Sequence, residues 1–399
     1  MTHPWNESHP HIAFKRQWDE VNSQLNRLLG EVVQPIETVG RIAVLPEDAE
    51  RFYRLALVKG VQGTLAIEGN TMTSKQIEEV LVENKSMPES RDYQVQEVRN
   101  IAEAFSTIAW GEVVESGKAA YLTPQLLLSF HKMVGKDVGE TFEAIPGHFT
   151  ERDRNVGKYR CPAPEHVPLM VAELCDWLRK EFGWTPEHPL PLDRAIILAI
   201  VAHVYIEWIH PFSDGNGRTG RLLEFYLLVR AGLPLPCTLL LSNHYNQTRE
   251  RYALELFKAG QTRSLTEFII YALQGFRDGL VEQRNELFKC QMHIVWREYI
   301  YKTFERGDGE KPSAAKVRRR RRTLTLNLEP EKTYKSIEAL IMTSSETAFA
   351  FGNLGQKTIQ RDVDALVELE LLVKDKTGYR SNVGLLRHYL PPRRNHPKE

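Results

Sequence analysis

The sequence contains no long hydrophobic run, few cysteines and no excess of either charge. None of its apolar stretches approaches the roughly 20 residues that a membrane-spanning helix needs. Its 52 Lys and Arg residues equal its 52 Asp and Glu residues. This balance excludes a general attraction to nucleic acid or to a membrane surface, so binding to either would require a local patch. We therefore expect no membrane partner, and we look for function in local motifs.

The cysteines are far apart in the sequence and show none of the paired spacings of a zinc site. Four cysteines can in principle form two disulfides, but reduced and buried thiols fit this composition better. The first residues, 1–6, do not have the basic and then apolar profile of a signal peptide. These features predict a cytoplasmic protein. The cysteines are Cys161, Cys175, Cys237 and Cys290.

Most of the chain has the pattern of α-helices, with one contrasting stretch. Proline, glycine and charged residues gather between 145 and 168, and they favour a short exposed β-hairpin with its tip at 151–155. The segment 193–209 is apolar almost throughout, as expected for a central buried helix. Other helices are predicted at 48–67, 78–81, 91–108, 123–135, 167–182, 218–229, 247–258 and 266–304.

The composition changes at 306–312, where glycine and charged residues precede a run of basic residues from Lys316 to Arg322. Such a change is typical of a domain boundary, which we place between about 304 and 333. The predicted organisation is an N-terminal helical region at 1–120, a core domain at 121–304, a basic linker or helix at 305–332 and a small domain at 333–399.

Twelve consecutive residues, from His210 to Arg221, combine several features of a phosphate-binding site. Gly215 and Gly217 allow a tight turn that brings backbone N–H groups against a ligand. The helix that begins there offers unpaired donors and a partial positive charge. Arg218 and Arg221 are three residues apart on one helix face, where their guanidinium groups can pair with phosphate oxygens. The pattern predicts a cradle for a polyphosphate.

Two other side chains of this loop can act on a bound polyphosphate. Asp214 precedes the glycines, and a lone carboxylate beside phosphates is a usual protein ligand of Mg²⁺. His210 ends the preceding helix, and a histidine can remove a proton from an attacking hydroxyl at neutral pH. Each feature alone has a simpler explanation as a helix cap, a turn or a solvated helix face. Their combination within twelve residues favours a catalytic site.

The stretch His-Pro-Phe-Ser-Asp-Gly-Asn-Gly-Arg-Thr-Gly-Arg, residues 210–221, resembles the signature of the Fic (filamentation-induced-by-cAMP) domain. The similarity extends over about residues 49–276. It implies a compact, mainly α-helical catalytic domain with a short β-hairpin flap, which transfers AMP from ATP to a Ser, Thr or Tyr hydroxyl. By this resemblance His210 is the general base, Asp214 holds Mg²⁺, Gly215, Asn216 and Gly217 cradle the phosphates, and Arg218 and Arg221 clamp the leaving pyrophosphate.

Two segments outside the loop resemble further parts of the family. The first resembles the flap, which holds the target segment as an added strand. Many relatives have Arg where this chain has Thr150, a difference that bears on the target sequence. The second includes Tyr245 and Tyr252 and resembles the nucleotide-base pocket, although tyrosines that only pack the helix are an equal alternative. The predicted flap residues are Gly147, His148, Phe149 and Thr150.

The segment Thr64-Leu65-Ala66-Ile67-Glu68-Gly69 stands at the end of a predicted helix, where the helix dipole disfavours a carboxylate. It resembles the family's inhibitory motif, Ser/Thr-x-x-x-Glu-Gly/Asn. The resemblance implies that Glu68 pairs with Arg221 and excludes the γ-phosphate of ATP from its productive place, since an Arg–carboxylate pair can compete with a phosphate. A helix that merely ends in Glu-Gly is the simpler alternative. A second role of Glu68 in removing AMP from modified targets stays open.

Residues 333–390 predict short helices at 336–341, 345–350 and 356–369, followed by a β-hairpin within 371–380. This order resembles a winged helix-turn-helix. Polar and basic residues at 356–361 and the arginines upstream would suit DNA, whereas Asp362 and Asp364 on the same predicted helix oppose it. DNA binding, a homodimer and docking of a target protein all stay open for this module.

The main prediction is an autoinhibited protein adenylyltransferase that uses ATP with Mg²⁺ and modifies an exposed hydroxyl of a protein. One alternative is a Fic-fold enzyme that removes AMP or transfers another nucleotide or phosphate group. The other is a winged-helix DNA-binding regulator that senses a nucleotide through a Fic fold.

Overall fold

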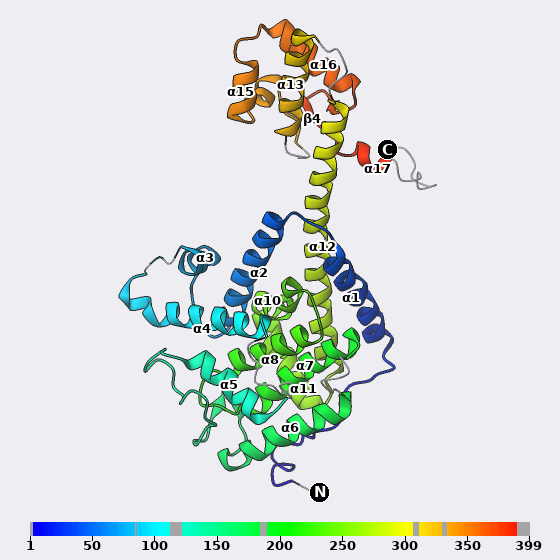
Figure 1. Cartoon of the computed structure of the whole chain (residues 1–399). Helices are drawn as coiled ribbons and strands as arrows, with labels where there is room; N and C mark the ends of the chain where they lie inside the picture. Colours follow the sequence, from blue (N-terminus) through cyan, green and yellow to red (C-terminus); the bar gives the residue numbers. More distant parts are fainter. Residues whose placement is uncertain are drawn as a thin grey trace. The chain divides into compact units, whose positions relative to one another are not determined.

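The computed structural model describes residues 3–83, 85, 87–111, 122–183, 190–305, 311–328 and 333–388 (Figure 1). These residues form two compact units, with the division along the chain between Glu286 and Leu287. Helices dominate both units, and the described strands form two antiparallel pairs. The predicted mainly α fold class is confirmed. No helix within the described stretches is both long and apolar enough to cross a membrane.

The first unit is a cluster of helices with one small β-hairpin. Its elements are α1 (Ser23–Arg41), α2 (Pro46–Ala66), α3 (Ser74–Val82), α4 (Asp92–Ala109), α5 (Pro124–Gly135), β1 (Asn155–Val156), β2 (Tyr159–Arg160), α6 (Val167–Phe182), α7 (Leu192–Ile209), α8 (Asn216–Arg230), α9 (Leu235–Thr238), α10 (Leu240–Gln247), α11 (Arg249–Thr262) and the start of α12 (Thr266–Thr303).

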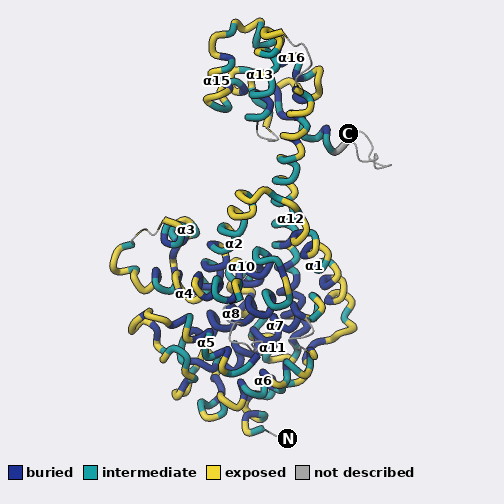
Figure 2. Tube along the Cα trace, in the orientation of Figure 1, coloured by how far each residue is buried: buried dark blue, intermediate teal, exposed yellow. Residues whose placement is uncertain are grey.

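The centre of this unit is the packed pair α7 and α8. Both helices are buried along nearly their whole length, and Figure 2 shows them mostly in dark blue. The sequence of α7 has no polar face, because apolar residues fill almost every position between Ala195 and Ile209. Such a helix is stable only when other helices surround it. Helices α1 and α6 pack against α7, and α2, α4 and α5 pack against α8, so the link between α7 and α8 lies at the core.

One local prediction for this unit is wrong, and one helix is found that the sequence does not predict. The hairpin turns at Gly157 and Lys158, because Val156 pairs with Tyr159 and Gly157 adopts the left-handed backbone conformation that such a turn needs; the charged residues 151–155 lead into the first strand instead. The helix predicted at 247–258 is present as α11, which begins two residues later and extends to Thr262; Thr248 separates it from α10, a helix that the sequence does not predict. The Thr248 hydroxyl bonds the His244 carbonyl and the Tyr271 hydroxyl.

The second unit has its own core and a short antiparallel β-hairpin. The predicted helix, helix, helix and hairpin are present in that order; their assignment as a winged helix-turn-helix stays a prediction. The arginine run lies in α13, where Arg320 and Arg321 pair with the buried Asp362. After the end of α12, the elements are α13 (Pro312–Leu326), α14 (Ile337–Ile341), α15 (Ser345–Phe351), α16 (Gln356–Glu368), β3 (Leu372–Lys374), β4 (Tyr379–Ser381) and α17 (Leu385–His388).

The predicted domain limits stay predictions. The second compact unit starts at Leu287, inside α12. Several positions of the predicted limits, at 120–121, within 306–310 and 329–332, and from 389 to 399, lie outside the described residues.

Candidate active site

The loop between α7 and α8 is held in one shape by its own side chains. The backbone is left-handed at His210 (φ 52°) and again at Gly215 (φ 79°), which directs the chain back into α8. The amide group of Asn216 accepts a hydrogen bond from the Phe212 N–H and donates one to the Phe212 carbonyl, both at 2.8 Å. Phe212 is fully buried and stacks on His131 at 3.8 Å. The Asn216 side chain thus closes the loop, and its predicted part in a phosphate cradle falls to its backbone.

A side chain at Gly217 would require neighbouring side chains to move. A Cβ atom at this position would overlap the Glu68 carboxylate and would lie 2.9 Å from a nitrogen of the Arg221 guanidinium. The backbone at the start of α8 is therefore in close contact with an ion pair. A ligand that replaced the Glu68 carboxylate would meet the same backbone and the same guanidinium.

Glu68 and Arg221, which are predicted to pair, are in contact. The Arg221 Nη2 donates to Glu68 Oε1 at 2.5 Å and to the Thr64 carbonyl at 2.9 Å. The Arg221 side chain is 1% exposed and the Glu68 side chain 29% exposed. Burial by itself would raise the pKa of Glu68, but the Arg221 guanidinium holds it below its usual value. This guanidinium is occupied by α2 and the turn after it.

Arg218 is paired with two carboxylates, one of which the sequence does not indicate. Its Nη2 donates to Asp214 Oδ1 at 2.7 Å, and its Nη1 makes a short hydrogen bond to Glu97 on α4. Burial raises the pKa of Glu97, and Arg218 acts against this shift. The Asn70 side chain donates to Glu97 Oε2 at 3.0 Å. Asn70 follows Glu68 by two residues. The turn after α2 therefore contacts both ion pairs, the Arg221 pair through Glu68 and the Arg218 pair through the bond from Asn70 to Glu97.

His210 is in the state that a base requires. Burial lowers the pKa of His210 to about 4, and the Glu68 carboxylate and the Glu207 backbone carbonyl act against this shift. The imidazole is therefore neutral at pH 7 and can accept a proton.

A cavity of about 350 Å³ lies beside this histidine. His210, Glu68 and Arg221 line one part of it, and apolar side chains of α11, including Leu256 and Phe257, line another. Tyr252 lines the cavity, whereas Tyr245 is not among its lining residues; their part in a nucleotide-base pocket stays a prediction. Tyr245 is fully buried and donates a hydrogen bond to Glu224 at 3.0 Å. Of the two tyrosines, Tyr252 can contact a ligand, and Tyr245 supports it from behind, with ring centroids 4.9 Å apart.

The predicted flap residues lie before the paired strands and are tied to the loop. The Thr150 N–H donates to the Pro211 carbonyl at 2.9 Å, and its hydroxyl lies 3.0 Å from that of Ser213. Phe149 stacks on Phe212 at 5.9 Å. His131, which no motif marks, accepts a hydrogen bond from the Gly147 N–H at 3.0 Å and bonds the Asp214 carbonyl at 3.0 Å. His148 is exposed. This segment is therefore anchored on the loop.

Asp214 is suited to a metal ion that takes most of its ligands from elsewhere. The Gly215 N–H and Arg218 both bond the same oxygen, Oδ1, and the side chain is 28% exposed. Within the described ranges, no three His, Cys, Asp or Glu residues come together as a metal site. A single carboxylate fits Mg²⁺, which keeps several waters and binds through substrate phosphates.

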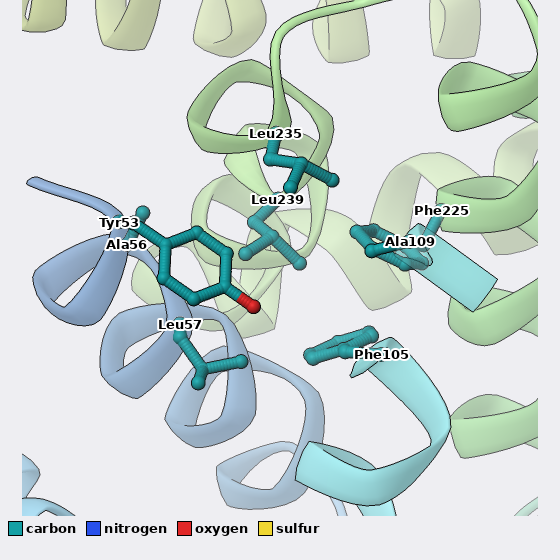
Figure 3. A pocket seen from close by; sticks show the side chains of 8 residues that line it. All are labelled: Tyr53, Ala56, Leu57, Phe105, Ala109, Phe225, Leu235 and Leu239. Carbon is teal, nitrogen blue, oxygen red and sulfur yellow. The ribbon is translucent and has the colours of Figure 1, made fainter. Parts of the chain in front are cut away.

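A second, smaller pocket between α2, α4, α8 and α9 has a different character (Figure 3). Its lining is almost entirely apolar and includes Leu57, Phe105, Phe225 and Leu239. In Figure 3 the Tyr53 hydroxyl, the polar group among the drawn side chains, points in among the apolar ones. Such a lining offers no counter-charge for a phosphate. The cavity beside His210 does contain charged side chains, Glu68, Glu207 and Arg221, and it is the candidate active site.

The fold and the site define a mainly α-helical protein in which a glycine-containing loop, closed by its own hydrogen bonds, leads into α8 beside a buried histidine. Residues 121–228 match the Fic/DOC family. The chain therefore contains a Fic domain, and the resemblance of its loop is confirmed.

Curated relatives agree with this assignment. The chain is 28% identical to protein adenylyltransferase Fic of Culex quinquefasciatus over 235 residues, 58% of this chain and 43% of that protein. It is 30% identical to protein adenylyltransferase fic-1 of Caenorhabditis briggsae over 174 residues, 44% of this chain and 32% of that protein. The chain thus spans less than half the length of these relatives.

Solved structures show the same fold. A Fic family protein from Desulfovibrio desulfuricans G20 superposes with a TM-score of 0.53 at 22% identity, over 92% of this chain and 98% of that chain. Fic-1 (aa134 - 508) from C. elegans superposes with a TM-score of 0.54 at 21% identity, over 67% of this chain and 74% of that chain.

Proposed function

We propose that this protein transfers AMP from ATP to a hydroxyl group of another protein, and that the Glu68–Arg221 pair holds the site inactive. The observation that carries the proposal is the single cavity in which a neutral His210, Arg221 and Glu68 meet beside the start of α8. The names of the relatives, protein adenylyltransferases, support the same reaction.

In this reaction the target hydroxyl attacks the α-phosphorus of ATP. The new bond joins the hydroxyl oxygen to that phosphorus, the bond to the β-phosphate breaks, and pyrophosphate leaves. His210 takes the hydroxyl proton, as its low pKa allows at pH 7. The backbone N–H groups at the start of α8 and the two guanidinium groups stabilise the phosphate charge. Mg²⁺ held by Asp214 would neutralise part of that charge.

The ion pair explains why the resting protein would be inactive. While the Arg221 Nη2 bonds both the Glu68 carboxylate and the Thr64 carbonyl, this nitrogen cannot bind a phosphate. A phosphate must displace the carboxylate, and a charge-assisted hydrogen bond of this kind contributes about 1.5–3 kcal/mol. Removal of the carboxylate should therefore raise activity about 10-fold or more.

The test compares ATP labelled at the α-phosphate with ATP labelled at the γ-phosphate, in wild type, Glu68→Gly and Glu68→Gly/His210→Ala. We expect transfer of the α label alone, at least about 10-fold more in Glu68→Gly, and none in the double variant. Glu50→Gln, an exposed carboxylate on the same helix α2, should behave as wild type. Transfer of the γ label would show a kinase-like reaction instead. A Glu68→Gly variant that is folded but no more active than wild type would contradict inhibition by the Glu68–Arg221 pair.

We further infer that the protein works in the reducing environment of the cytoplasm. Cys161, Cys175 and Cys237 are buried and form no disulfide, which supports an origin where disulfides do not form.

A further inference from the structure

The cavity beside His210 contains a second carboxylate that the reaction above does not use. Glu207 lies on α7, three residues before His210, and lines the same cavity. Its Oε1 atom is buried and has no hydrogen-bond partner within the described part of the chain. Glu68, the other carboxylate of the cavity, is paired with Arg221. A buried acceptor without a partner is costly, so this oxygen is prepared for a donor that enters with a ligand.

The position of Glu207 relative to α8 indicates which part of a nucleotide it would meet. A Cβ atom on Gly220 would lie 3.6 Å from Glu207 Oε1, and Gly220 is the neighbour of Arg221. The phosphate-binding groups stand at this side of the cavity. Leu256 and Phe257 of α11 contribute apolar lining to the same cavity, and Phe257 is 58% exposed. In a nucleotide with its phosphates at Arg221 and its base on this apolar lining, the sugar would lie next to the phosphates, where Glu207 also stands.

We propose that Glu207 accepts a hydrogen bond from a ribose hydroxyl of ATP and makes the site select ribonucleotides over deoxyribonucleotides. This inference rests on the proposed use of ATP. A carboxyl oxygen is a good acceptor for a sugar hydroxyl, and acidic residues bind ribose hydroxyls in other nucleotide-binding folds. Burial raises the pKa of Glu207 to about 7, with Glu68 acting in the same direction and Arg221 against it. The carboxylate and the neutral acid both provide an acceptor oxygen.

The test is binding rather than catalysis, in a Glu68→Gly/His210→Ala background that cannot transfer AMP. Affinities for ATP, 2′-deoxyATP and 3′-deoxyATP are measured by calorimetry before and after Glu207→Ala. We expect the parent to bind ATP about 10-fold more tightly than at least one deoxy analogue. Glu207→Ala should weaken ATP binding to the level of that analogue and remove the preference. Glu207→Gln, which keeps an acceptor oxygen and the side-chain volume, should retain part of the preference.

Glu250→Gln is the matched control, since Glu250 is an exposed carboxylate on α11 that does not line the cavity; it should leave the preference unchanged. The inference is overturned if the parent shows no preference, or if Glu207→Ala and Glu207→Gln weaken all three nucleotides equally, which indicates a structural role. The inference is also overturned if the parent binds ATP more tightly than inosine triphosphate, and Glu207→Ala removes this difference but keeps the difference between ATP and the deoxy analogues. That result would place Glu207 at the base. If the folded parent binds no nucleotide at all, the proposed function fails together with this inference. The other negative outcomes concern Glu207 alone.

Discussion

At the scale of single residues, the site depends on two arginines whose charges are compensated inside the protein. The Arg218 and Arg221 side chains are 5% and 1% exposed, and burial of an unpaired guanidinium would be unfavourable. Each therefore has a carboxylate from outside the loop, Glu97 and Glu68 respectively. Because each guanidinium is already paired, a phosphate can bind it only by displacing the carboxylate or by binding beside it.

We predict that Glu97→Gln lowers the free energy of unfolding by about 2 kcal/mol, because it leaves a buried guanidinium with a weaker partner. Glu103→Gln is the matched control on α4. Glu103 pairs with Lys136 at the surface, where both side chains are about half exposed, and exposed pairs contribute little. Urea unfolding of both variants measures the difference. If the two substitutions change the free energy of unfolding equally, the buried Arg218–Glu97 pair contributes no more to stability than an exposed pair.

At the scale of elements, the position of the inhibitory Glu68 depends on how α2 packs. Helix α2 ends just before Glu68 and lies against α10. Two glycines allow this contact, since a Cβ atom on Gly60 would lie 2.7 Å from the Leu239 side chain, and one on Gly63 would lie 3.2 Å from the Asn243 backbone. The close approach of these helices sets where the turn after α2 presents its carboxylate.

We predict that Gly63→Leu raises AMP transfer several-fold and lowers stability by about 1–3 kcal/mol. The new side chain cannot displace the Asn243 backbone without moving α2, and overpacking of this kind is destabilising. A shift of α2 weakens the Glu68–Arg221 pair one turn further on. The α-label assay and urea unfolding measure the two effects. Gly30→Leu on α1 is the control, because nothing lies within 4 Å of a Cβ atom there. If Gly63→Leu is destabilised but AMP transfer does not increase, the packing of α2 does not control the Glu68–Arg221 pair.

At the scale of the whole molecule, the two compact units have separate cores. The core of the second unit includes Trp296, Leu324, Phe351 and Leu366. It also contains a charged group, since Asp362 is fully buried and accepts hydrogen bonds from Arg320 and Arg321. Part of the basic run that would suit DNA is therefore used inside this unit.

We predict that Asp362→Ala destabilises the second unit by about 3 kcal/mol, because it leaves two guanidinium groups without their shared partner. AMP transfer by the Glu68→Gly form should not change. Calorimetry with and without ATP distinguishes the units, since only the transition of the first unit should shift with ligand. Asp364→Ala on the same helix, which removes an exposed hydrogen bond from Gln360, serves as the control. A loss of transfer activity in Asp362→Ala would contradict this independence.

Local patterns in the sequence were enough for several elements and for most of the loop. The sequence predicts helix α6 with its observed bounds, Val167–Phe182, and it predicts α7 as a central helix because its residues are apolar on every side. The loop 210–221 was recognised because its chemistry lies within twelve consecutive residues. These features depend on neighbours in the chain, which the sequence displays directly.

Other features depend on contacts across long separations, and only the tertiary structure decided them. Glu97 lies 121 residues from Arg218, and its position on α4 has no distinctive spacing. The sequence does not indicate Glu207, because nothing in it tells whether a carboxyl oxygen has a hydrogen-bond partner. The break at Thr248 and the turn at Gly157 depend on side-chain bonds and strand register that propensity does not contain. The sequence alone determined which chemical groups the loop offers, whereas packing decided which of them are paired, because pairing depends on distances through space.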